Sequence, residues 1–159
     1  LSARSDVLRV VVDGLRTLPI RVALATGSTD PAVLQAPADW LVRPYLAQVA
    51  VLGRASAAVT HAGNNSVTEA LTAGVPLVAL PFSTDQFAGA AALEAAGLAV
   101  ALDPNAATAS AVGESVTAAL SPRSADAARS VGEGLRRDPG PSRGWRAVMK
   151  GAIRPAGLG

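Results

Sequence analysis

The chain has 159 residues, a net charge of +2 and no cysteine. That length fits one domain with a sizeable core, and the lack of cysteine excludes disulfides and thiolate metal sites. Half of the residues are hydrophobic but only 3% are aromatic, so the core must consist mainly of Ala, Val and Leu. No apolar run approaches the roughly 18 residues of a membrane span. No signal peptide is visible either, so we expect a cytoplasmic protein without a membrane span.

Basic residues are unevenly distributed. Eight of the 14 Lys and Arg residues lie between Arg123 and Arg154. Such clusters occur in nucleic-acid-binding proteins, but Trp145 is the only aromatic residue among them. We therefore interpret this region as a solvated segment and expect no nucleic-acid partner.

In chain order, helical and strand patterns alternate. Apolar residues recur at helical spacing from Ser2 to Leu18, where Pro19 ends the pattern. The expected strands are 20–25, 40–42, 57–60, 75–80 and 98–102. The other expected helices are 48–54, 67–73, 86–96, 108–120 and 123–137. This alternation is typical of an α/β fold, a Rossmann-like parallel sheet flanked by helices. We expect strand 57–60 to be buried on both faces and a sixth strand to precede Leu1.

The composition changes near residue 138. We predict a folded domain over 1–138 and a tail over 139–159 that is irregular or contains a short helix near Trp145. The tail is rich in Pro, Gly and Arg and has no clear periodicity. The chain lacks an initiator Met and begins inside a helical pattern. We therefore expect it to be a piece of a longer protein.

The most informative stretch is Thr60–Ala70, which predicts the end of a strand, a tight turn and the start of a helix. His61 within it is the only histidine of the chain. The N–H groups of Asn64, Asn65 and Ser66 would open the helix without intrahelical partners. Together with the helix dipole and the imidazole, they would suit an anion such as a diphosphate.

The same residues allow a purely structural interpretation. Ser66 and Glu69 have the spacing of a capping box, in which the carboxylate bonds the first backbone N–H. The residues alone leave both interpretations open. The turn is neither a Walker loop nor a GxGxxG motif, which disfavours nicotinamide cofactors.

Two further loops follow strands and carry polar or aromatic groups. Asp85 and Gln86 at a helix start would suit the hydroxyl groups of a sugar, although Asp85 alone is more simply an N-cap. Tyr45 offers a flat face for a base and Gln48 an amide, although Tyr45 alone is more simply a packing residue. In open α/β sheets such loops meet at the carboxyl ends of the strands.

Together these spacings resemble the donor-binding signature of the GT-B glycosyltransferases. The motif runs from His61-Ala-Gly-Asn-Asn-Ser66 through Glu69, Gly74 and Pro76 to Pro81 and Asp85-Gln86. It is most similar to the bacterial antibiotic and macrolide glycosyltransferases of the UDP-glycosyltransferase superfamily, over about 20–120.

The resemblance implies a role for each matched residue. His61 would lie beside the diphosphate, and Glu69 would accept the ribose hydroxyls. Asp85 and Gln86 would face the transferred sugar. The phosphate oxygens would be bound by the turn residues Gly63, Asn64, Asn65 and Ser66. Tyr45 stands where the family commonly has a base-stacking Trp, and Gln48 follows it at the family's spacing.

The resemblance also implies partners and a mechanism. The donor would be a dTDP-sugar or UDP-sugar, and the acceptor a small molecule such as a natural product. The catalytic base would be a His of an N-terminal acceptor domain, so we expect no catalytic residue in this chain. The configuration would invert, and no metal or other cofactor would be needed because no Asp-x-Asp pair is present.

Two alternatives remain open. One is a non-catalytic nucleotide-binding or helper module. The other is a different GT-B relative, such as a nucleotide-sugar 2-epimerase or the peptidoglycan GlcNAc transferase. The Asp85-Gln86 pair favours the glycosyltransferase.

Overall fold

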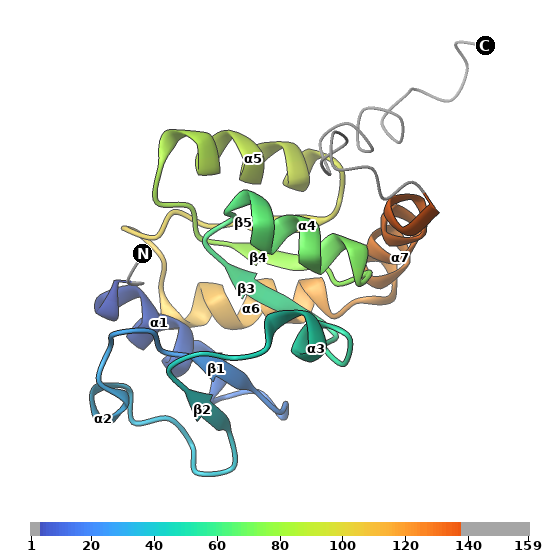
Figure 1. The fold of residues 1–159 in the computed structure, drawn as a ribbon. Coiled ribbons are helices and arrows are strands. Elements are labelled where there is room, and N and C mark those ends of the chain that lie inside the picture. Colours follow the sequence, from blue (N-terminus) through green and yellow to red (C-terminus); the bar gives the residue numbers. More distant parts are fainter. Residues whose placement is uncertain (1–3, 138–159) are drawn as a thin grey trace, which may run out of the picture.

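The structure, a computed structural model, describes residues 4–137; the predicted tail lies outside them. Helices and strands alternate through these residues, which confirms the predicted α/β fold (Figure 1). The helices are α1 (Ser5–Leu15), α2 (Pro31–Leu34), α3 (Gln48–Leu52), α4 (Asn64–Thr72), α5 (Thr84–Ala95), α6 (Ala109–Ala119) and α7 (Pro122–Arg137). The strands are β1 (Ala23–Ala25), β2 (Leu41–Arg43), β3 (Ala58–Thr60), β4 (Leu77–Ala79) and β5 (Ala99–Ala101).

All strand pairs are parallel, as predicted, but they form two sheets rather than one. β1 pairs with β2, and β3, β4 and β5 pair in that order. Within the described residues β1 and β3 therefore each have one edge without a ladder partner. In a doubly wound sheet of order 3-2-1-4-5-6 the first strand lies between the second and the fourth. The five strands fit that order as the second to the sixth, so the position between β1 and β3 holds no strand among the described residues.

β4 divides the hydrophobic core into two halves. Successive side chains of a strand point to opposite faces. Leu77 and Ala79 accordingly lie in the cluster formed with α4, α5 and α7, whereas Val78 and Leu80 lie in the cluster with α1 and α6. Figure 1 shows α4 and α5 on one side of this sheet and α6 on the other. A strand covered on both faces must be apolar throughout, and every residue of β4 is buried.

The prediction that strand 57–60 is buried on both faces is only partly met: Ala58 packs against one core cluster and Val59 against the other, but neither is fully buried. All three residues of β3 are only half-buried. The physical reason is that β3 has a neighbouring strand on one edge alone, whereas β4 lies between two.

Several element boundaries differ from the predicted ones for local reasons. The helix α2 was not among the predicted helices, yet its start is favourable because Pro31 is its first residue and the Asp30 side chain accepts from the Ala32 N–H at 3.0 Å. α4 begins three residues earlier than predicted. Gly74 and Gly97 end α4 and α5 with φ of +73° and +74°, as expected for left-handed helix ends.

Between residues 4 and 137 no helix combines the length and the apolar character that crossing a bilayer demands.

Candidate functional site

The start of α4 presents a set of backbone donors. Gly63 is the N-cap residue, and no side chain bonds the first turn. The first helical bond runs from the Val67 N–H to the Gly63 carbonyl at 3.0 Å. The N–H groups of Asn64, Asn65 and Ser66 therefore have no intrahelical partner, and no described residue bonds them otherwise. Such a helix start attracts anions.

The turn before α4 has a strained backbone that brings His61 close to this helix start. Ala62 has φ of +68°, in the left-handed region that a residue with a Cβ rarely adopts. Its N–H donates to Thr60 Oγ1 at 3.2 Å. A Cβ built on Gly63 would lie only 2.8 Å from His61 Nε2, so the imidazole lies directly against the N-cap. Glycine leaves the imidazole room here, because the ring occupies the space that a side chain at this position would take.

Burial lowers the pKa of His61 below its ordinary value of 6.5. The shift favours the neutral imidazole, which donates one hydrogen bond and accepts another. It can add one donor to the backbone donors of α4 without carrying a permanent charge.

Gln48 and Glu69, two predicted site residues, are in direct contact. Gln48 Nε2 donates to Glu69 Oε2 at 2.8 Å, which joins the first residue of α3 to α4. The capping box that the spacing of Ser66 and Glu69 allowed is therefore not formed: the helix begins earlier, and the carboxylate bonds α3 instead. Tyr45, which precedes α3, is 83% exposed and has no packing role among the described residues.

The start of α5 corrects the structural interpretation of Asp85. Ser83 is the N-cap, and its Oγ accepts from the Gln86 N–H at 3.4 Å. Gln86 Oε1 accepts from the Phe82 N–H at 2.8 Å. Asp85 is exposed and not the cap, and no described residue bonds its carboxylate. Within the described residues, neither the side-chain NH₂ of Gln86 nor the carboxylate of Asp85 therefore has a hydrogen-bond partner.

The structure adds residues that the sequence did not indicate. The Phe82 ring lies parallel to the His61 imidazole, with 6.2 Å between ring centroids and 1° between planes. Arg4 Cζ lies 5.9 Å from the Phe82 ring centroid. Arg4 donates to Asn105 Oδ1 and Asp6 Oδ2, each at 2.7 Å. No motif of the sequence relates these residues, because they come together only through the loops that follow β3, β4 and β5.

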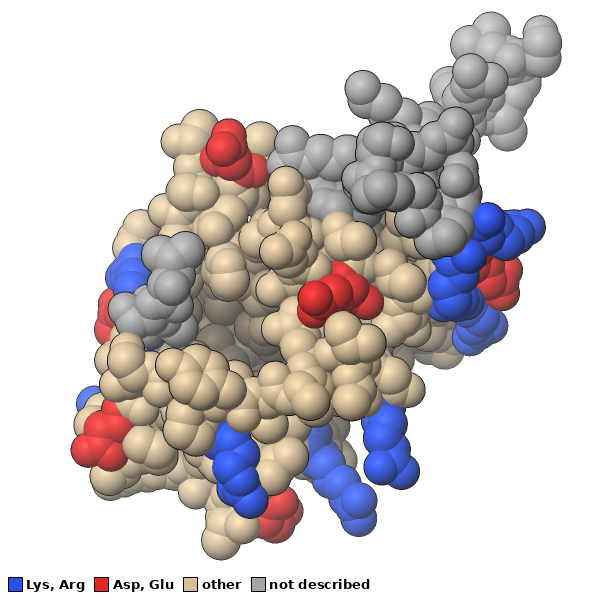
Figure 2. All heavy atoms as spheres, in the orientation of Figure 1, with Lys and Arg blue, Asp and Glu red and all other residues tan. Residues whose placement is uncertain are grey.

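The surface around this region is hollowed. Figure 2 shows a hollow beside α1 and β3, bordered mainly by residues without formal charge, and one acidic patch between α3 and α4. The structure thus links His61 to Phe82, Phe82 to Gln86, and Gln48 to Glu69. Among the described residues, Tyr45 makes no side-chain hydrogen bond to another predicted site residue.

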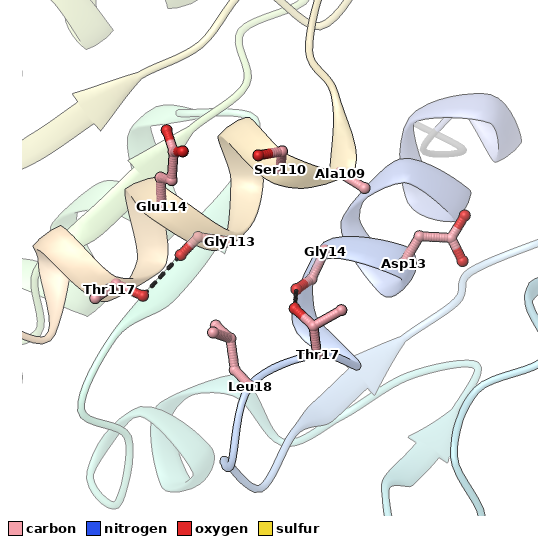
Figure 3. A pocket seen from close by; sticks show the side chains of 9 residues that line it. All are labelled: Asp13, Gly14, Thr17, Leu18, Ala109, Ser110, Gly113, Glu114 and Thr117. Carbon is pink, nitrogen blue, oxygen red and sulfur yellow. Dashed lines mark hydrogen bonds between the residues drawn. The ribbon is translucent and has the colours of Figure 1, made fainter.

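A separate recess of about 580 Å³ lies between α1 and α6 and contains none of the predicted site residues (Figure 3). Gly14 and Gly113 let the two helices cross closely here. The hydroxyls of Thr17 and Thr117 bond the carbonyls of Gly14 and Gly113, each at 2.9 Å. Because these hydroxyls are already used, we assign the recess to helix packing.

The comparison with protein families decides the classification. The family model described as UDP-glucoronosyl and UDP-glucosyl transferase matches residues 2–125. The chain belongs to this family. Its helix start at α4 and the loops before α3 and α5 are therefore those of a UDP-glycosyltransferase-like chain.

Individual relatives agree with this classification. An uncharacterized UDP-glucosyltransferase of Bacillus subtilis, YojK, is 32% identical over 115 residues, which are 72% of this chain and 28% of the relative. The NDP-glycosyltransferase YjiC of the same species is 33% identical over 122 residues, 76% of this chain and 31% of the relative. This UDP-glycosyltransferase-like chain therefore spans less than a third of the length of these two relatives.

Solved structures show the same fold. The calicheamicin glycosyltransferase CalG4 superposes with a TM-score of 0.78 and 28% identity, covering 96% of this chain and 41% of CalG4. This confirms the GT-B resemblance inferred from the sequence. The relatives and structural neighbours are named glycosyltransferases, as predicted.

Proposed function

We propose that this chain is the donor-binding half of an inverting, metal-independent glycosyltransferase. It would bind a dTDP-sugar or UDP-sugar, and the complete enzyme would transfer the sugar to a small-molecule acceptor such as a natural product. The observation that carries the proposal is the start of α4. There the N–H groups of Asn64, Asn65 and Ser66 have no described partner, and His61 lies against the N-cap.

The proposed binding mode follows the polar groups outward from this helix start. The diphosphate would accept from the α4 N–H groups, the Ser66 hydroxyl and His61. The Glu69 carboxylate would accept hydrogen bonds from the ribose hydroxyls. Tyr45, being exposed, would stack on the base. Asp85 and the NH₂ of Gln86 would bond the sugar hydroxyls.

The proposed chemistry uses these groups to stabilise the leaving nucleotide. An acceptor oxygen would attack the anomeric carbon from the face opposite the diphosphate, with inversion. Negative charge then develops on the leaving phosphate oxygen, where the helix start and His61 would stabilise it. The base that takes the acceptor proton would belong to the N-terminal acceptor domain, and the sequence has no Asp-x-Asp pair to recruit a metal ion.

Calorimetric titration of the chain with UDP and with dTDP tests the proposal. We expect at least one nucleotide to bind, and His61→Ala and Glu69→Ala to weaken that binding. Omission or addition of Mg²⁺ should leave the affinity unchanged. Failure of both nucleotides to bind the folded chain would refute the donor-site assignment.

A further inference from the structure

The Phe82 ring is close to two other side-chain groups. One is the His61 imidazole, whose plane is within 1° of the Phe82 plane. The other is the Arg4 guanidinium, whose Cζ lies 5.9 Å from the same ring. Both separations fall in the range of aromatic stacking and cation–π contacts. None of the nucleotide-binding roles proposed above uses Phe82 or Arg4.

Both ends of this arrangement are fixed. The Phe82 backbone N–H is held by Gln86 Oε1 at 2.8 Å, at the start of α5. Arg4 is held by Asp6 Oδ2 and by Asn105 Oδ1, each at 2.7 Å. The ring of Phe82 is therefore held through its own backbone and by a guanidinium that has its own anchors.

The His61 imidazole is also close to the N-cap of α4, since a Cβ on Gly63 would lie 2.8 Å from Nε2. The imidazole thus lies close both to the start of α4 and to the parallel ring of Phe82. Rotation away from the helix start would break the parallel arrangement with Phe82. The strained φ of +68° at Ala62 fixes the backbone that carries the imidazole.

From this geometry we propose that Phe82 is a positioning residue, which holds the His61 imidazole against the α4 N-terminus, and that Arg4 supports it through the outer part of the ring. The inference rests on the proposed function, because the diphosphate of the bound nucleotide is the group that this imidazole would meet. The loops after β3, β4 and β5 would then share one role, the placement of the His61 imidazole. Phe82 acts through His61 and need not touch the ligand.

The single histidine makes the test direct. The Cε1–H signal of His61, followed by NMR in the ligand-free chain without a histidine tag, reports its pKa and its ring environment. We expect Phe82→Leu to raise the pKa of His61 toward 6.5, because the loss of the aromatic ring exposes the imidazole to more water. Phe82→Tyr, which retains the ring, should restore the wild-type signal. Phe87→Leu is the matched control, since Phe87 is on the same helix start and 46% exposed.

Arg4→Gln separates support through Phe82 from a direct effect. Alone, it should shift the His61 signal in the direction of Phe82→Leu, but less. Combined with Phe82→Leu, it should cause no further shift, because the ring through which it acts is gone. If Arg4→Gln shifts the His61 signal as much in the Phe82→Leu background as it does alone, the proposed role of Arg4 is wrong.

Nucleotide affinity completes the test. Phe82→Leu should weaken UDP or dTDP binding by about three- to tenfold, the worth of one aromatic contact, and Phe82→Tyr should restore it. If the wild-type chain binds nucleotide but Phe82→Leu leaves both the His61 signal and the affinity unchanged, the positioning role is wrong. If Phe82→Leu shifts His61 but wild type binds neither nucleotide, the proposed function fails and the positioning contact stands.

Discussion

Gln48 Nε2 donates a hydrogen bond to Glu69 Oε2 over 2.8 Å and so joins the start of α3 to the middle of α4. The two residues are 21 positions apart, and each was predicted separately to bind the donor. Their contact means that the carboxylate is held in place by the amide rather than by the end of its own helix. The pair therefore forms one unit of the candidate site.

This pair leads to the first prediction. Glu69→Ala should weaken nucleotide binding about tenfold or more, because charge-assisted bonds to the ribose would be lost. Loss of the exposed Gln48–Glu69 hydrogen bond should lower the unfolding free energy by only about 0.5–1 kcal/mol. Gln48→Ala should weaken binding less, and the double variant should be non-additive when measured by calorimetry. Glu114→Ala, an exposed carboxylate on α6, is the control; additive losses would show that the pair is not a unit.

The second prediction concerns pH. Burial lowers the folded-state pKa of His61 below 6.5, so between the two pKa values the unfolded chain binds more protons than the folded chain. The unfolding free energy therefore rises with pH across that window. The contribution is fully present above 6.5 and is lost as the pH falls through 6.5 toward the folded pKa.

Urea unfolding at several pH values measures this effect. The wild type should lose more stability than His61→Gln between about pH 7.5 and pH 5. Since His61 is only half-buried, the difference should be small. Identical pH profiles of the two proteins would contradict the depressed pKa.

The third prediction separates binding from stability at Gly63. Its φ of −65° is open to alanine, but the new Cβ would lie 2.8 Å from His61 Nε2. The imidazole must therefore move, and we expect Gly63→Ala to weaken nucleotide binding about tenfold while unfolding changes by less than about 1 kcal/mol. Calorimetry and thermal unfolding measure the two effects. Wild-type affinity in Gly63→Ala would mean that the position of His61 is unimportant.

The fourth prediction distinguishes the cap of α5 from its sugar-binding candidate. Ser83→Ala should cost about 1 kcal/mol of stability, because it removes the N-cap hydroxyl. Asp85→Ala should leave stability nearly unchanged, since Asp85 is not the cap. Asp85→Ala should instead reduce the affinity for the UDP-sugar relative to UDP alone. A loss of stability in Asp85→Ala equal to that in Ser83→Ala would restore the capping interpretation.

The fifth prediction tests the crossing of α1 and α6. A Cβ on Gly14 would lie 2.5 Å from the Ala109 carbonyl oxygen, a backbone atom that cannot rotate away. Gly14→Ala should therefore destabilise the fold by about 1–3 kcal/mol, although alanine is the better helix former. Gly113→Ala is the matched variant, because its Cβ would meet the Gly14 carbonyl only at 3.4 Å. Chemical unfolding should show a clear loss for the first and little change for the second.

The sequence by itself determined the alternation of strands and helices. The hydrophobic period and the residues that end helices are local properties. Runs such as Val75–Leu80 and glycines such as Gly74 and Gly97 could therefore be interpreted without tertiary contacts. The motif around His61 could likewise be recognised in the sequence because its residues are contiguous. The family comparison agreed with it.

Only the tertiary structure decided where the side chains meet. Nothing in the sequence shows that Glu69 turns to Gln48 rather than to its own helix start, or that Ser83 rather than Asp85 caps α5. The parallel rings of His61 and Phe82, with Arg4 beyond them, depend on three loops and the start of α1 arriving at one edge of the sheets. Such contacts form between segments that are distant in the chain, so the local spacing of residues cannot predict them.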